Sequence, residues 1–310
     1  MKKYLSAKAG KHIIDTYDEL LKAWDVPFDE INLEGAYGTT HIITVGEKKN
    51  PPMVLFHGVG DDAALMWLYN AKALAKAYRL YAVDTLGGPG KSEPGAGYDK
   101  QFDDVKWIDE LFDGLQLESA VLVGVSHGGY LAQLYTLNRP QRVKRAVCLA
   151  STVPVSAGGS PMKTMMKIFM PEALFPTKNN TLRLLRKLSG KNSAAFTDHP
   201  LIMEHYRWLL WGFNNMAMGY HKVEYFTDAQ VDAIRDKAVY LMGEADPFAK
   251  LGGQALLLRY KMHARFFPDV GHGINHEIAD EINQILMVLT EPYHCNIIKQ
   301  IGESGLSQWL

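Results

Sequence analysis

The chain of 310 residues is poor in cysteine and carries almost no net charge. Its two cysteines, Cys148 and Cys295, are too few for a disulfide framework or a four-thiolate metal site. Lysine and arginine number 33 against 34 aspartates and glutamates, so the net charge of −1 gives no overall field that would attract nucleic acid or anionic lipid. We therefore expect a protein of a reducing compartment that binds neither nucleic acid nor a membrane.

Long apolar runs are also missing. No stretch of 18 residues stays apolar and uncharged, as a membrane-spanning helix requires. Lys2 and Lys3 stand near the N-terminus, but Lys8, Lys11 and His12 occupy the place where the apolar part of a secretory signal would lie. These absences predict a soluble, cytoplasmic protein.

What is present is the composition of an ordinary globular chain, with 47% hydrophobic and 22% charged residues. The first thirty residues place apolar side chains three and four positions apart, which predicts an amphipathic helix that ends at Pro27. From Ile31 to Val45 the pattern changes to short strand-like pieces broken by Gly35 and Gly38, which indicates antiparallel strands at a sheet edge.

Six short apolar runs follow, and most alternate with segments that can form helices. Such an alternation indicates a mostly parallel sheet with helices on both faces, and hence the α/β fold class. The runs are Met53 to Phe56, Leu80 to Val83, Ala120 to Val125, Arg145 to Leu149, Ala238 to Met242 and Ala264 to Phe267.

The stretch from Ser151 to Asp236 has no strand-like run and is rich in methionine and aromatic residues. We interpret it as a helical insertion whose apolar side chains form either its own core or the wall of a pocket. The predicted organisation is a helical segment at 1–28, a core at 29–150 and 237–290, a helical lid at 151–236 and a tail at 291–310. The apolar tail either packs on its own domain or mediates a dimer, so both a monomer and a homodimer stay open.

The pentapeptide Gly124-Val125-Ser126-His127-Gly128 ends an apolar run and opens a helix-capable stretch. This context predicts a tight strand-to-helix turn that exposes the Ser126 hydroxyl, with glycine needed two positions before and after it. The positive end of the following helix would lie beneath the site. The alternative interpretation is a glycine-bearing turn whose serine only caps the helix.

A serine hydroxyl needs a base within hydrogen-bond reach, and that base needs an acid to orient it. His272 follows the last apolar run and is the candidate base, while Asp246 follows the run that ends at Met242 and is the candidate acid. The chain order Ser, Asp, His is the order expected of a strand-to-helix nucleophile turn. Glu244 is a competing acid.

A metal centre and a phosphate-binding loop are the alternatives to this interpretation. His276 lies four residues after His272, but no third ligand motif accompanies the pair and Gly273 interrupts a continuous helix, so we expect no metal. The glycine-rich stretch after Asp84 lacks the spacing of a P-loop or of a dinucleotide fingerprint. We interpret it as a packing loop that Asp84 anchors.

Five motifs in this order resemble the α/β-hydrolase fold superfamily, within it the lid-bearing serine carboxylesterase-like branch of bacterial type. The resemblance extends from about Ile31 to Leu289 and implies a mostly parallel central sheet, helices on both faces and a helical lid. It also favours Asp246 over Glu244 as the acid. The motifs are His57-Gly58, Asp84 with Gly87 to Ser92, the Ser126 turn, Gly243 to Asp246 and Gly271-His272.

The resemblance further implies an oxyanion hole formed by the backbone N–H groups of Val59 and His127. It gives His57 a structural role in the loop that carries Val59. In the lid, Trp208, Trp211 and Met216 are the residues that we expect to contact substrate.

The predicted function is hydrolysis of small to medium carboxylic esters through a Ser-His-Asp acyl-enzyme mechanism, without metal or organic cofactor. Dehalogenases and epoxide hydrolases of this fold place an aspartate at the turn, so Ser126 argues against both reactions. The same three residues could instead cleave a thioester, a lactone or a carbon–carbon bond beside a ketone. A third hypothesis is a sensing module that binds a ligand without sustained turnover, which a turnover number would distinguish.

Overall fold

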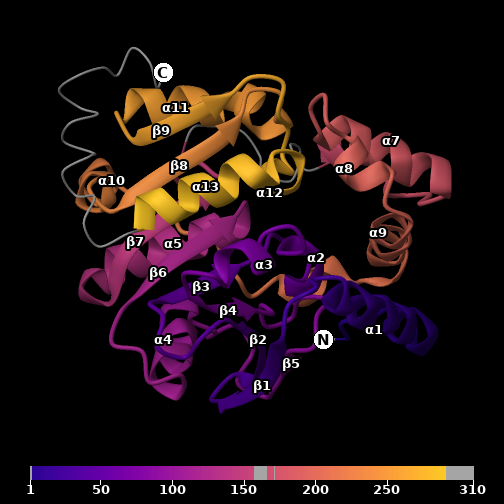
Figure 1. Ribbon diagram of the computed structural model, residues 1–310, viewed down its shortest axis with the longest axis horizontal. Helices are drawn as coiled ribbons and strands as arrows, with labels where there is room; N and C mark the ends of the chain where they lie inside the picture. Colours follow the sequence, from indigo (N-terminus) through magenta and orange to yellow (C-terminus); the bar gives the residue numbers. More distant parts are fainter. Residues whose placement is uncertain (1, 157–165, 171, 291–310) are drawn as a thin grey trace.

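The computed structural model describes residues 2–156, 166–170 and 172–290, so Cys295, the tail, Met162 and Met165 lie outside the described residues. Within this part of the chain nine strands form one sheet (Figure 1), in the order β1-β2-β4-β3-β6-β7-β8-β9 with β5 beside β2. The strands are β1 (Phe28–Gly35), β2 (Gly38–Val45), β3 (Pro52–Phe56), β4 (Arg79–Val83), β5 (Glu93–Pro94), β6 (Ala120–Val125), β7 (Val143–Leu149), β8 (Ala238–Gly243) and β9 (His263–Phe267).

The sheet is mostly parallel and has an antiparallel edge, as predicted. β1 and β2 form a hairpin around the pair Gly35 and Gly38, and β2 also pairs antiparallel with β4. From β4 through β3, β6, β7 and β8 to β9 every neighbouring pair is parallel. The carboxyl ends of the parallel strands therefore meet at one edge, where ligand sites of such sheets usually lie.

Helices cover both faces of the sheet. The longer ones are α1 (Ala7–Lys22), α4 (Asp104–Gly114), α5 (His127–Asn138), α7 (Lys178–Leu188), α9 (Pro200–Gly212) and α13 (Ala279–Thr290). The shorter ones are α2 (Ala63–Met66), α3 (Ala71–Leu74), α8 (Ala194–Thr197), α10 (Asp228–Ile234), α11 (Gln254–Arg259) and α12 (Ile274–Glu277), with one-turn elements η1 (Pro140–Arg142), η2 (Asn215–Met218) and η3 (Ala249–Gly253).

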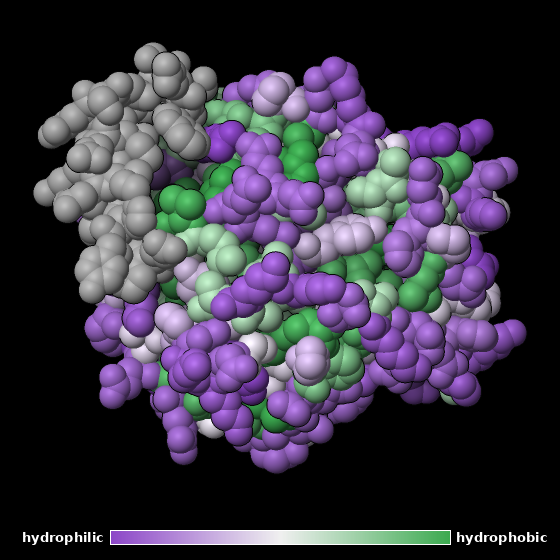
Figure 2. All heavy atoms as spheres, viewed as in Figure 1, coloured by the Kyte–Doolittle hydropathy of each residue, from purple (hydrophilic) through white to green (hydrophobic). Residues whose placement is uncertain are grey.

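Alternate residues of the strands enter two separate apolar clusters. Val121 and Val123 of β6 pack with residues of α1, α2, α3, α9 and α13, whereas Leu122 packs with residues of α4, α5, α10 and α11. This alternation is the period of two that a strand buried on both faces must show. On the face of the molecule in Figure 2 hydrophilic residues dominate, and hydrophobic residues show in small separate areas.

The N-terminal helix forms where its periodicity predicts it, but it ends at Lys22 and not at Pro27. The Ser6 hydroxyl accepts a hydrogen bond from the Ala9 amide and so caps the first turn of α1. Ile13, Tyr17 and Leu20, three to four residues apart, have no exposed surface. α1 is thereby fixed to the body of the protein rather than extending from it.

One predicted helix is interrupted. The sequence from Ala63 to Tyr78 holds no glycine or proline and predicts one helix, but the structure has two short helices, α2 and α3, separated by a turn at residues 67–70. Asn70 in this turn is fully buried, and its side-chain amide donates to the Asn275 carbonyl and to Asn283 Oδ1. These two bonds to residues about 200 positions away favour the turn over a continuous helix.

The segment between β7 and β8 contains α7, α8, α9, η2 and α10, and its other described residues include the non-helical stretches 151–156 and 219–227. Figure 1 shows α7, α8 and α9 grouped at one side of the molecule, between α1 and α12. α9 packs against α1, while α10 packs against α5 of the core. The exact division into core and lid stays a prediction. In the described part of the chain, no helix combines the length and the apolar composition needed to cross a bilayer.

Candidate active site

Ser126 lies on the turn between β6 and α5, as the sequence predicts. Its backbone has φ 55° and ψ −114°, a combination that residues with a side chain rarely adopt. The turn closes so tightly that a Cβ at Gly124 would overlap the Gly128 carbonyl, and a Cβ at Gly128 would overlap the Phe56 carbonyl oxygen. The Ser126 amide donates to the Leu149 carbonyl at 2.8 Å. The surrounding strands therefore hold the serine in its strained conformation.

Two segments with backbone N–H donors flank Ser126. His127 is the first residue of α5, and the first amides of a helix have no acceptor within the helix. On the other side, the loop after β3 passes so close that a Cβ at Gly58 would lie 3.5 Å from the Ser126 Cβ. Val59, the next residue, is 46% exposed. The two predicted oxyanion donors thus belong to segments that adjoin the serine.

His57 is hydrogen-bonded to the backbone of this loop and to that of the residue after Asp84. Its Nε2 accepts a hydrogen bond from the Thr85 amide at 2.9 Å, and because that nitrogen accepts, Nδ1 carries the proton and donates to the Gly58 carbonyl at 2.8 Å. The side chain has no exposed surface, and burial lowers its pKa. Both ring nitrogens are occupied by backbone, as the structural role predicted for His57 requires.

His272 and Asp246 form a hydrogen-bonded pair. Asp246 lies on the turn after β8 and His272 on the loop after β9, and the distance from His272 Nδ1 to Asp246 Oδ2 is 2.9 Å. The carboxylate is fully buried, and its Oδ1 accepts from the Phe248 amide at 2.7 Å. Glu244, the competing acid, is exposed. The structure therefore pairs the histidine with the acid that the resemblance favours.

The electrostatic surroundings of His272 include a second acid, Glu277 of α12, which sequence reasoning missed. Burial lowers the pKa of His272, but the Asp246 carboxylate and its hydrogen bond, with Glu277, raise it above the ordinary 6.5. Glu277 is buried, accepts from the amides of Gly190 at 2.7 Å and Gly271 at 3.1 Å, and has a pKa raised by burial. No sequence motif marks Glu277, since its role depends on the loop before His272 folding back over α12.

The side chain of His127 is distinct from its amide. Its Nε2 is buried and lacks a hydrogen-bond partner among the described residues. Burial, with the charges of His221 and His57, lowers its pKa to about 3, so the imidazole is neutral at neutral pH. Its ring lies 5.4 Å from that of Tyr130 and 5.7 Å from that of His221. An uncharged ring thus stands next to the serine.

The three predicted lid contacts lie in two different places. Trp208 is 7% exposed and stacks on His12 of α1, with ring centroids 4.2 Å apart. Trp211 is about half exposed and lies 5.0 Å from Trp208. Met216 is exposed on η2, next to Asn215, whose side chain lies against Gly60 of the oxyanion loop. Trp208 therefore packs mainly on α1, and substrate contact by any of the three stays a prediction.

An apolar cluster of the insertion reaches the histidine. Ile168, Leu184 and Leu188 form it, and Phe248 packs against it. The Phe248 ring in turn lies 4.7 Å from the ring of His272, and the Leu188 carbonyl accepts from the His272 amide at 2.7 Å. Phe248 was not predicted, because its place depends on how the insertion folds. The insertion thus supplies an apolar surface beside the candidate base.

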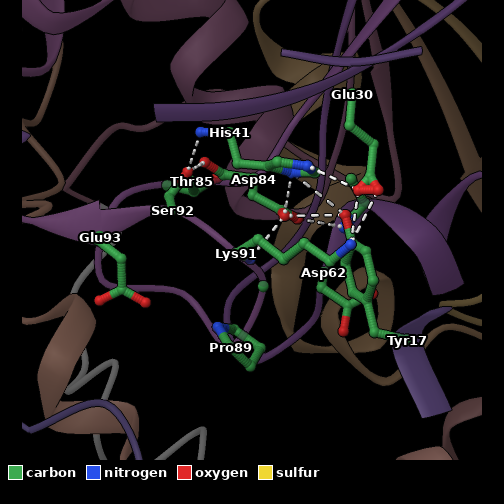
Figure 3. A network of polar contacts seen from close by, with 12 residues as sticks. Tyr17, Glu30, His41, Asp62, Asp84, Thr85, Pro89, Lys91, Ser92 and Glu93 are labelled. Atoms are coloured by element: carbon green, nitrogen blue, oxygen red, sulfur yellow. Dashed lines mark hydrogen bonds and ion pairs between the residues drawn. The ribbon is translucent and has the colours of Figure 1, made fainter. Parts of the chain in front are cut away.

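Asp84 anchors the loops behind the site, as its motif predicted (Figure 3). Its Oδ2 accepts from the Tyr17 hydroxyl, from His41 Nδ1 and from the Lys91 amide, all at 2.8–2.9 Å. Its Oδ1 accepts from the Ala63 amide at 3.0 Å, at the start of α2. Although burial opposes it, these donors and the nearby histidines hold the pKa of Asp84 well below its usual range. A buried carboxylate thus joins α1, β2 and the segment after the oxyanion loop.

His276, weighed as a metal ligand, is directed elsewhere. Its Nε2 donates to the Leu65 carbonyl at 3.0 Å, and its ring contacts those of Tyr69 and Phe196. Among the described residues no group of three or more histidine, cysteine or acidic side chains is arranged to hold a metal ion.

Comparisons with known proteins bear on the fold and on the class of enzyme. A family profile described as alpha/beta hydrolase fold matches residues 51–192. Carboxylesterase YbfK of Bacillus subtilis is 35% identical over 147 residues, which are 47% of this chain and 49% of that protein. The uncharacterized carboxylesterase nap of the same organism is 28% identical over 291 residues, 90% of this chain and 92% of that protein. The chain thus spans about half of YbfK and nearly all of nap.

Solved structures extend the likeness to almost the whole chain. The naproxen esterase of Bacillus subtilis superposes with a TM-score of 0.78 at 23% identity, covering 92% of this chain and 99% of that one. The carboxylesterase CesB (YbfK) gives a TM-score of 0.75 at 24% identity, covering 91% and 98%. At these identities the likeness is one of fold.

Proposed function

Because the chain belongs to the α/β-hydrolase fold family and is carboxylesterase-like, we propose that it hydrolyses small to medium carboxylic esters through Ser126, His272 and Asp246. The observation that carries the proposal is the buried Asp246 bonded to His272, on loops at the carboxyl edge of the sheet where β6 also presents Ser126. Its named carboxylesterase relatives support the same reaction.

In this mechanism Ser126 Oγ attacks the ester carbonyl and His272 Nε2 accepts its proton. Asp246 holds the imidazole through Nδ1 and stabilises its charged form. The amides of Val59 and His127 stabilise the oxyanion, and the N-terminus of α5 adds its positive end. His272 then protonates the leaving alcohol and activates water, which releases the acid and restores the serine.

The surroundings support a neutral, partly apolar substrate. An apolar surface beside His272 is formed by Phe248, Ile168, Leu184 and Leu188. The His127 ring near Ser126 is uncharged at neutral pH. Apolar walls with a few directed polar groups are typical of small-molecule sites. The proposed partner is a small-molecule ester, in a cytoplasmic protein that acts as a monomer or homodimer, with no cofactor required for the chemistry.

Turnover of p-nitrophenyl esters by Ser126→Ala tests the proposal. We expect kcat to fall by roughly 10⁴-fold or more, since the nucleophile is lost while the fold stays intact. Ser119→Ala, in the loop before β6, is the matched control and should keep wild-type activity. A loss of less than tenfold in Ser126→Ala would contradict the assignment.

The same assay separates the other hypotheses. A panel of thioesters, lactones and β-ketone compounds shows whether another bond is preferred. A single turnover per chain that leaves a persistent adduct would indicate sensing, whereas sustained release of product indicates an enzyme.

A further inference from the structure

A second hydroxyl–imidazole–carboxylate chain lies outside the proposed catalytic residues. It joins Thr16 of α1, His205 of α9 and Asp62, which follows the oxyanion loop. His205 Nε2 lies 2.7 Å from Asp62 Oδ2, and His205 Nδ1 lies 2.7 Å from Thr16 Oγ1. These residues come from the N-terminal helix, the insertion and the core, and His205 and Asp62 are 143 positions apart in sequence.

This chain is not a second reactive centre. The side chains of His205 and Asp62 have no exposed surface, so no substrate reaches them. The carboxylate fixes the proton on one nitrogen, because Nε2–H donates to Asp62 Oδ2. Nδ1 lies 2.7 Å from Oγ1 of Thr16, whose hydroxyl also lies 2.8 Å from the His12 carbonyl of its own helix. Both ring nitrogens of His205 and Oδ2 of Asp62 have hydrogen-bond partners. Thr16, His205 and Asp62 therefore form a fixed polar contact inside an apolar interface.

Asp62 in turn fixes the segment that carries the proposed oxyanion donor. Its Oδ1 accepts from the Leu65 amide at 3.0 Å and caps α2. Its own amide donates to Asp61 Oδ1 at 2.9 Å. Val59 is only three positions earlier, on the loop that touches Ser126. The loop is therefore held at one end by His57, which donates to the Gly58 carbonyl, and at the other by Asp62.

We propose that His205 is a positioning residue for this oxyanion loop and couples helix α9 of the insertion to it. The inference rests on the proposed esterase function. A carboxylate buried without a partner is strongly unfavourable, so loss of the His205 donor would displace Asp62 and the loop with it. Misplacement of a catalytic donor by about 1 Å costs up to roughly a hundredfold in rate.

Three substitutions at His205 test this. His205→Gln keeps an amide N–H near the place of Nε2, His205→Asn is one carbon too short to reach Asp62, and His205→Phe keeps the ring volume without a donor. We expect His205→Phe and His205→Asn to lower kcat by roughly tenfold to a hundredfold with KM within about threefold, and His205→Gln to keep most of the activity. The inhibition constant of a trifluoromethyl ketone, which forms an oxyanion on the serine, should rise in parallel with the loss in kcat.

A loss of stability alone would not produce this pattern. Leu20→Ala is the control. It truncates a fully buried residue on α1 and should lower the melting temperature while leaving Thr16, His205 and Asp62 unchanged. The proposal is overturned if the Phe and Asn variants keep wild-type kcat, as Leu20→Ala should, or if KM rises instead. Should the Phe variant fail to fold, equal kcat in the Asn and Gln variants overturns it. An inactive wild-type protein would contradict the proposed function itself, which is a different outcome.

Discussion

His272 donates from Nδ1 to Asp246 Oδ2 across 2.9 Å, and the carboxylate that receives this bond has no exposed surface. The two residues come from loops after β8 and β9, the last two strands of the sheet. A buried acceptor on Nδ1 leaves Nε2 of the imidazole as the nitrogen that can take a proton from a nucleophile.

Asp246→Asn should lower kcat by roughly 10⁴-fold, because the amide can donate to Nδ1 and so stabilise the wrong tautomer of His272. Glu244→Gln is the matched control, since Glu244 is exposed two positions away. We expect it to behave as wild type in the same ester assay. Equal losses in both variants would show that the acid has been misassigned.

The activity should have an acid limb that lies above pH 6.5. His272 must be neutral to accept a proton, and its pKa is raised, so kcat/KM falls as the pH drops through this elevated value. Glu277→Gln removes one of the charges that raise the pKa, and the limb should move to lower pH. Glu118→Gln, an exposed glutamate before β6, should leave the profile unchanged. A limb that does not move in Glu277→Gln contradicts this electrostatic role.

Asp84→Asn tests the anchor of Figure 3. The substitution replaces a buried carboxylate, which accepts hydrogen bonds from Tyr17, His41 and two backbone amides, with a neutral amide. The free energy of unfolding, measured by urea denaturation, should therefore fall by roughly 3–5 kcal/mol. Asp113→Asn breaks an exposed pair with Arg142 and should change the stability little. Similar midpoints in the two variants would argue against the anchor.

Trp208 and Met216 should respond differently to truncation. Trp208→Ala removes a buried ring stacked on His12 and should lower the free energy of unfolding by about 3 kcal/mol. Met216→Ala, on exposed η2, should leave the stability unchanged and alter KM across a series of ester chain lengths. If Met216→Ala changes no KM in that series, its predicted substrate contact is wrong.

Local patterns predicted most of the fold because they depend on neighbours in sequence. The runs at Val54, Leu122 and Tyr240 became parallel strands, and the crowding of Gly124 against Gly128 is a property of five consecutive residues. The fold class was confirmed by the comparisons, and a profile described as alpha/beta hydrolase fold matches residues 51–192.

Contacts between residues far apart in sequence could not be predicted from such local patterns. The helix expected from Ala63 is broken by the bonds of Asn70 to Asn275 and Asn283, which no local propensity reveals. Glu277 and His205 gain their surroundings only when the insertion and the C-terminal loops fold onto the core. The nucleophile turn could therefore be placed from sequence, whereas the residues that support the base and the oxyanion loop could not.

The most direct measurement is labelling with a fluorophosphonate, followed by digestion and mass mapping of the modified peptide. We predict one label per chain on Ser126, loss of ester turnover in proportion to labelling, and much slower labelling in His272→Ala. Label on another residue, or full turnover after Ser126 has been labelled, would contradict it.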